Sequence, residues 1–170
     1  MAASNPQTAA GVRITHPNRE KPIVRSTRVV VILLMVISAG LVALITIGGW
    51  EVLEGAIPVQ IGYVLIYLTL AYYAGRWNRG VLPVVSSLAV LLIIFALVSA
   101  PGWFDRDKTG FSQPTLNAGL LGTLTFLIIP VQILLIVFAM RGFSQGWNVE
   151  VEHQANPAAG DYSDLSPNPA

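Results

Sequence analysis

The sequence predicts an all-α membrane protein in which four transmembrane helices form an up-down antiparallel bundle with disordered termini. Of the 170 residues, 54% are hydrophobic and 11% are charged, whereas about a quarter of an average soluble domain is charged. The apolar residues lie in four long blocks that contain no Asp, Glu, Lys, Arg or His. Because every backbone polar group in hydrocarbon needs an internal partner, blocks of this apolar, non-alternating kind must be helices.

The four blocks are expected to cross the membrane at residues 29–50, 56–74, 81–100 and 116–140, within a transmembrane domain at 29–140. About 20 residues are needed to cross some 30 Å of hydrocarbon at 1.5 Å per residue. The first block is too long for the apolar region of a cleaved signal peptide, which typically has about 7–15 residues. The first two connections are too short for any arrangement except antiparallel neighbours.

The two terminal segments, 1–28 and 141–170, are expected to be disordered tails, the first basic and the second acidic and rich in Pro and Ala. An N-terminus on the cytoplasmic side places eight of the ten Lys and Arg residues there, so both termini are predicted to be cytoplasmic in a cell (inner) membrane. Trp50 and Trp103 then mark the outer interface, and Trp77 and Trp147 the inner one. The alternating residues 147–152 also fit a peptide that adds as a strand to a partner.

Several function classes are excluded by residues that the chain lacks. There is no cysteine, so disulfides, thiolate metal sites and thiol nucleophiles are impossible. His16 and His153 lie in the tails, which leaves no paired histidines for haem inside the membrane. Proton relays and ion paths use ionisable residues within spans, and these spans have none. We therefore expect no catalysis and no cofactor, and neither tail has the composition for nucleic-acid binding.

Polar residues inside the spans are the candidate site residues. Gln60, Tyr63 and Tyr67 recur at i, i+3 and i+7, so they share one face of the second helix. Gln132 lies deep in the fourth block, two residues after Pro130, which removes one backbone hydrogen bond. The structural interpretation is hydrogen bonding between helices. The functional alternative is the wall of a pocket for a lipid-like head group.

One loop resembles the first half of a calcium-binding loop, with oxygen-bearing side chains at Asp105, Asp107 and Thr109. The twelfth position, which should carry a bidentate Glu, is Leu116. A turn with local ion pairs is therefore favoured, and no metal site is expected. A hydrolytic site built on the acidic loops around Glu51 and Asp105 is the least supported alternative, because no histidine accompanies them.

Two further patterns concern the packing of the helices. The segment 57–61, Ile-Pro-Val-Gln-Ile, recurs at 129–133, which raises the question of an internal duplication, although the copies lie at different depths in their spans. Small residues form seams, as close helix packing in lipid requires. The seam residues are Ala39, Ala43, Thr46, Ser86, Ala89, Ala96, Ala100, Ala118, Gly122 and Thr125. These seams fit a compact bundle or a docking face for another protein.

Two functional hypotheses follow. The first is a non-enzymatic accessory, assembly or scaffolding subunit, with a protein partner or a second copy of the chain, and with anionic lipid head groups around the basic N-terminal segment. The second is a small permease or channel for a neutral or lipid-like solute. It predicts that Gln60, Tyr63, Tyr67 and Gln132 line one cavity.

Overall fold

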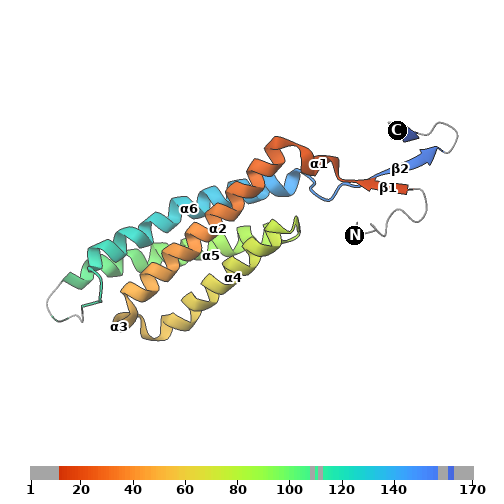
Figure 1. Cartoon of the computed structure of the whole chain (residues 1–170). Coiled ribbons are helices and arrows are strands. Elements are labelled where there is room, and N and C mark those ends of the chain that lie inside the picture. The colour runs from red at the N-terminus through yellow and green to blue at the C-terminus, as the bar shows by residue number, and fades with distance from the viewer. Residues whose placement is uncertain (1–11, 108–109, 111–112, 157–160, 163–170) are drawn as a thin grey trace.

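The structure is a computed structural model that describes residues 12–107, 110, 113–156 and 161–162. Its four long helices are α2 (Pro22–Gly48), α4 (Ile57–Gly75), α5 (Val81–Phe104) and α6 (Ala118–Ser144) (Figure 1). Within the described residues, four helical segments are long and apolar enough to cross a membrane, α4 being counted together with the short turns before it. The prediction of an all-α four-helix membrane protein is confirmed.

The helices extend beyond the apolar blocks from which they were predicted. The first begins at Pro22 rather than at residue 29, because proline fits the first helical turn, where its missing N–H has no helical partner. The third runs through Pro101 to Phe104. The blocks mark the stretch that hydrocarbon must cover, whereas backbone hydrogen bonding continues into the polar flanks. Between the long helices lie α3 (Trp50–Leu53), η2 (Glu54–Ala56) and η3 (Asp105–Asp107).

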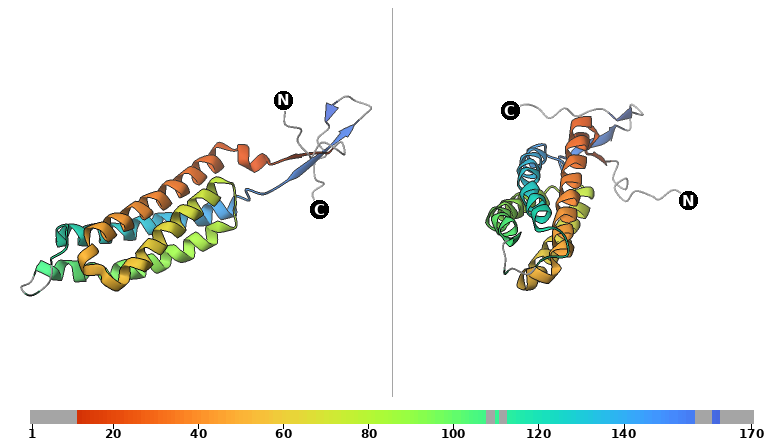
Figure 2. Two further views of the ribbon diagram at one scale, coloured as in Figure 1. Left: turned by 60° about the horizontal axis from the view of Figure 1, so that its bottom comes forward. Right: turned by 90° about the vertical axis from the view of Figure 1, so that its left-hand side faces the viewer.

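The helices pack unevenly around α2 and α6. Helix α2 packs against α4 on one side and α6 on the other, and α5 packs against α6. Helices α4 and α5 are consecutive in the chain but touch little (Figures 1 and 2). Both terminal segments leave the same end of the bundle, which we call the terminal end. The opposite end carries α3 and η3 and is called the loop end.

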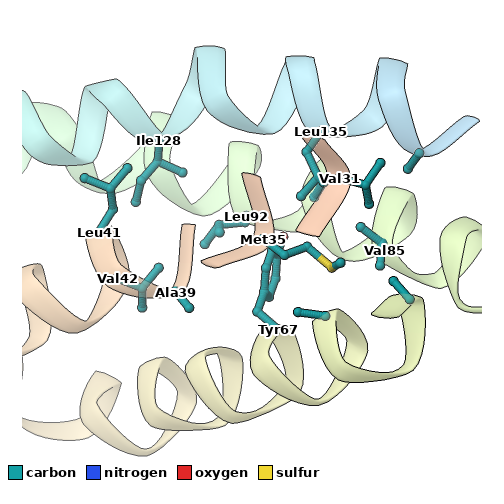
Figure 3. Packing of buried hydrophobic residues seen from close by; sticks show 14 of the residues in the cluster. Val31, Met35, Ala39, Leu41, Val42, Tyr67, Val85, Leu92, Ile128 and Leu135 are labelled. Carbon is teal, nitrogen blue, oxygen red and sulfur yellow. The ribbon is translucent and has the colours of Figure 1, made fainter. Parts of the chain in front are cut away.

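The core lies along the bundle axis. Figure 3 shows Val31 and Met35 from α2, Tyr67 from α4 and Leu135 from α6 among its buried side chains. The predicted small-residue seams also lie inside, since all of them except Ala43 are buried. At Gly122, ring carbons of Phe104 lie 2.8 Å from where a Cβ would be. The seams therefore close contacts within this bundle and do not form an outward docking face.

Parts of both terminal segments form secondary structure that the sequence analysis did not expect, whereas residues 1–11, 157–160 and 163–170 of the expected disordered tails lie outside the described residues. Strand β1 (Val12–Thr15) pairs antiparallel with β2 (Val151–Asn156), and β3 (Asp161–Tyr162) pairs with the end of β2. A short helix, α1 (Pro17–Glu20), connects β1 to α2. Each tail supplies backbone partners to the other, a contact that the composition of neither tail alone reveals. Of the segment 147–152, which was considered for strand addition, only the last two residues belong to β2, where Val151 pairs with Thr15 and Glu152 with Ile14.

Candidate functional site

A cavity of about 650 Å³ opens between α4 and α5 toward the loop end of the bundle. We call it the α4–α5 groove. Its lining is mostly apolar and comes from all four long helices. Representative lining residues are Val42 and Ile45 of α2, Val59 of α4, Phe95 and Val98 of α5, and Ile128 of α6. The volume is within the range of about 300–1,000 Å³ typical of small-molecule sites.

Two aromatic rings meet in the groove where α4 approaches α5. The rings of Tyr63 and Phe95 lie 6.1 Å apart between centroids and are nearly perpendicular, at 84°. This edge-to-face arrangement is a favourable geometry for aromatic pairs. Tyr63 also lies 6.0 Å from the ring of Tyr67, one turn further along α4. The groove is therefore narrowed by aromatic contact on its side toward the terminal end.

Polar groups line the groove toward the loop end. The Thr46 hydroxyl lies 2.5 Å from Gln60 Oε1 and 2.7 Å from the carbonyl oxygen of Val42. A hydroxyl carries one proton, so Thr46 donates to one of these two acceptors at a time. Arg106 stacks over the ring of Trp103 at 5.5 Å. The groove thus has an apolar body and a polar end.

Gln132 forms a buried three-helix brace instead of lining the groove. The hydroxyl of Tyr67 on α4 donates to Gln132 Oε1 at 2.8 Å, and Gln132 Nε2 donates to the Ser38 hydroxyl on α2 at 2.7 Å. Ser38 in turn donates to the carbonyl oxygen of Leu34 at 2.7 Å. Both Gln132 and Ser38 are fully buried. These bonds satisfy polar groups that would otherwise be exposed to hydrocarbon.

The structure therefore divides the four polar residues singled out in the spans into two groups. Gln60 and Tyr63 line the α4–α5 groove. Tyr67 and Gln132 bind each other in the core and are absent from the groove lining. A single cavity lined by all four residues, which the permease hypothesis requires, is not what the structure contains.

The calcium-like turn is only partly described. Asp105 is exposed at the start of η3. The side chain of Asp107 and the whole of Thr109 lie outside the described residues. In the part of the chain that the structure describes, no three His, Asp or Glu side chains come close enough to hold a metal ion.

A second cluster of aromatic and cationic side chains lies at the terminal end and is called the Trp77 cluster. The rings of Trp77 and Trp147 meet edge to face at 5.8 Å. The guanidinium of Arg28 lies 3.9 Å from the centroid of the Trp77 ring, and that of Arg19 lies 5.6 Å from it. Such stacking is a cation–π interaction, which strengthens as the groups leave water.

The N- and C-terminal segments meet at this cluster. Arg19 Nε donates to the carbonyl oxygen of Trp147 at 3.0 Å, and Asn18 Nδ2 donates to that of Gly146 at 3.1 Å. Gln145 Nε2 donates to the hydroxyl of Thr27 at 3.0 Å. The terminal segments therefore close this end of the bundle.

Trp147 is the residue of this cluster that the sequence analysis placed wrongly. It was expected at the lipid interface, but it is fully buried in protein. Gly146 has a φ of +60°, the left-handed conformation that commonly ends a helix. Because the chain turns there, the indole of Trp147 folds back toward Gly142. The signal in the sequence was the glycine at the end of the helix followed directly by tryptophan.

The geometry thus provides an apolar groove with a polar rim near one end and a closed aromatic–cation cluster at the other. Comparisons of this chain with protein-family models, with curated proteins and with solved structures found no match.

Proposed function

We propose that this integral membrane protein binds one long-chain, lipid-like amphiphile in the α4–α5 groove. The observation that carries the proposal is a cavity of small-molecule size that lies between two membrane-crossing helices and has an almost entirely apolar lining. A hydrocarbon chain is the occupant whose chemistry matches that lining. It is also the medium that surrounds the two helices in a bilayer.

The polar end of the groove indicates how the amphiphile would be oriented. Gln60 and Arg106 line the groove toward the loop end. Arg106 is held by its stacking on Trp103, so its guanidinium can meet an acidic or phosphate-bearing head group at a defined position. The chain would extend from there past Val98 toward Phe95.

The orientation in the membrane belongs to the same proposal. Eight of the ten Lys and Arg residues belong to the segments at the terminal end, and such residues are concentrated on the cytoplasmic side of membrane proteins. In the proposed orientation the terminal end therefore faces the cytoplasm and the loop end faces the outside of the cell membrane. The groove then takes its ligand from the outer half of the bilayer. No catalytic step is proposed, because the groove lining contains no acid, no histidine and no hydroxyl paired with a base.

The accessory-subunit hypothesis now has less support than lipid binding. Its small-residue seams are buried inside the bundle, so they offer no surface to another protein. Helix α4 nevertheless buries only Tyr67, Ala71 and Ala74. A protein partner or a second copy of the chain could therefore cover the groove, and the test below distinguishes this alternative from lipid binding.

The test is to fill the groove and measure what it retains. Ser99 lines the groove on α5, and Ser87 is another exposed serine on the same helix, outside the lining. Each hydroxyl donates to the carbonyl oxygen four residues earlier. Ser99→Trp and Ser87→Trp are therefore a matched pair. The purified variants are incubated with a lipid that carries a photoreactive chain, irradiated, and the labelled residues are identified by mass spectrometry.

We expect label on groove residues in the unmodified protein and at least a tenfold loss in Ser99→Trp, with no loss in Ser87→Trp. Equal labelling of the two variants would mean that the lipid only surrounds the bundle and would overturn the proposal. Capture of a stoichiometric protein at Val98 in place of lipid would overturn it in favour of a protein interface.

A further inference from the structure

We infer that the terminal end holds a second binding site, specific for the phosphate group of an anionic lipid, formed by Arg28, which lies over Trp77, and by Arg79, which lies over Phe143. This site is distinct from the α4–α5 groove, which opens toward the opposite end of the bundle, and it does not depend on what the groove binds. Its recognition elements are two guanidinium groups fixed in place by aromatic rings.

The first argument is the charge at this end. The described cations on the helices and connections there are Arg19, Lys21, Arg25, Arg28, Arg76, Arg79 and Arg141. The carboxylates whose side chains are described at this end, those of Glu20 and Glu150, are exposed and form no ion pair with these cations. Two of the guanidinium groups, those of Arg19 and Arg28, lie over the same Trp77 ring. Bringing like charges together around one ring without a counter-ion favours the binding of an anion.

The second argument is the pair of unused donors. Nε of Arg28 and Nε of Arg79 are both buried, and neither has an acceptor within the described residues. Arg28 already donates from Nη1 to the carbonyl oxygen of Gly75 at 3.2 Å, and its Nε–H is not used in that bond. Both Nε–H groups therefore lack an acceptor among the described residues, and the oxygen atoms of an anion could supply one. Phosphate oxygens match the planar fork of arginine.

The third argument is that both guanidiniums are held rigidly. Arg28 lies 3.9 Å from the Trp77 ring and Arg79 lies 4.2 Å from the Phe143 ring. Trp77 itself has a φ of 62°, the left-handed conformation with which α4 ends, and the N–H of the next residue, Asn78, donates to the carbonyl oxygen of Tyr73 at 3.1 Å. Here the edge contact with the buried Trp147 holds the indole in place.

The fourth argument identifies the source of the phosphate. Tyr72 and Tyr73 are exposed in the last turn of α4, and tyrosines gather at the level of lipid head groups. Arg76, one turn later, stacks on Tyr72 and donates to its hydroxyl. Trp77 and Arg79 follow directly in the same turn of chain. The phosphate of a lipid head group is therefore at the depth of the site.

The experiment is native mass spectrometry of the whole protein in mild detergent, with phosphatidylglycerol or phosphatidylcholine added. Arg28→Gln and Arg79→Gln are compared with Arg25→Gln and Arg141→Gln, which remove the same charge from exposed positions. We expect retention of phosphatidylglycerol to fall at least tenfold in the first two variants and less than twofold in the controls. Arg28→Lys, which keeps the charge without the fork, should lose retention as Arg28→Gln does.

Three outcomes would overturn the inference. Equal losses in all four glutamine variants would show diffuse attraction to a basic surface. Full retention in Arg28→Lys would show that charge alone suffices. Displacement of the lipid by millimolar inorganic phosphate would assign the site to the free ion. The thermal unfolding midpoint of each variant is measured beside retention, and only variants within a few degrees of the parent are compared.

Discussion

The buried amide of Gln132 should stabilise the bundle by linking three helices, and replacing it with leucine tests this. Leucine has a similar volume and cannot bond to Tyr67 or Ser38. Interhelical hydrogen bonds in membrane proteins contribute about 0.6 kcal/mol on average and up to about 1.7 kcal/mol. The substitution removes two such bonds. Tyr67 is only 2% exposed, so its hydroxyl is left without an acceptor inside the bundle. We therefore expect Gln132→Leu to lower the free energy of unfolding by about 2 kcal/mol.

A double-mutant cycle separates the hydrogen bond from the change in packing. Tyr67→Phe removes only the hydroxyl and should cost about 1 kcal/mol, most of which should disappear when it is combined with Gln132→Leu. Reversible unfolding in bicelles measures all four proteins of the cycle. Thr69→Val is the control, because the exposed Thr69 hydroxyl bonds only within its own helix, to the carbonyl oxygen of Leu65. Strictly additive effects of the two substitutions would refute the brace between α4 and α6.

Three further predictions test packing and topology. Gly49→Ala should lower the free energy of unfolding by about 1–3 kcal/mol, because the new Cβ would lie 2.6 Å from the indole of the buried Trp103. Gly40→Ala is the control and should be neutral or stabilising, since nothing lies within 4 Å of its Cβ position. Chemical unfolding measures both variants. Trp147→Ala should lower the free energy of unfolding by about 3–5 kcal/mol, as for other buried aromatic residues, and equal stability to the parent would contradict its role in closing the terminal end. Since the chain has no cysteine, a single cysteine in place of Glu54 should react with an impermeant maleimide in intact cells, and labelling only after lysis would reverse the proposed orientation.

The membrane-crossing architecture was predictable because it depends on local composition. Long apolar blocks without charge determine helices in hydrocarbon whatever their neighbours are. The small-residue seams were also visible, since Ala89 and Ala96 recur on one helix face and are both buried. The helices against which these seams pack could not be predicted, because periodicity identifies the face of a helix but not the helix that contacts it. For this reason both a compact bundle and an outward docking face remained open until the structure placed the seams inside.

The candidate sites were less predictable because they depend on contacts between distant segments. The sequence identified the helix face that Gln60, Tyr63 and Tyr67 share. Neighbouring residues on that face nevertheless have different roles, because Tyr63 lines the groove and Tyr67 is hydrogen bonded to Gln132 in the core. The Trp77 cluster combines the start of α2, the turn after α4 and the segment after α6. No local pattern reports that Arg19 and Trp147, 128 residues apart, are hydrogen bonded.

The groove and the core brace have a common physical origin in how α4 is attached. Its polar contacts run to α2 and α6, through Gln60 to Thr46 and through Tyr67 to Gln132. Helix α5 is attached instead to α6, by close packing of small residues. Each helix of the α4–α5 pair is thus bound to a different neighbour. Helix α4 packs mainly on α2 and meets α5 at Tyr63 and Phe95, while the groove opens between α4 and α5 toward the loop end. Loss of the Gln60 contact should therefore change the width of the groove, whereas loss of the Gln132 brace should weaken the whole bundle.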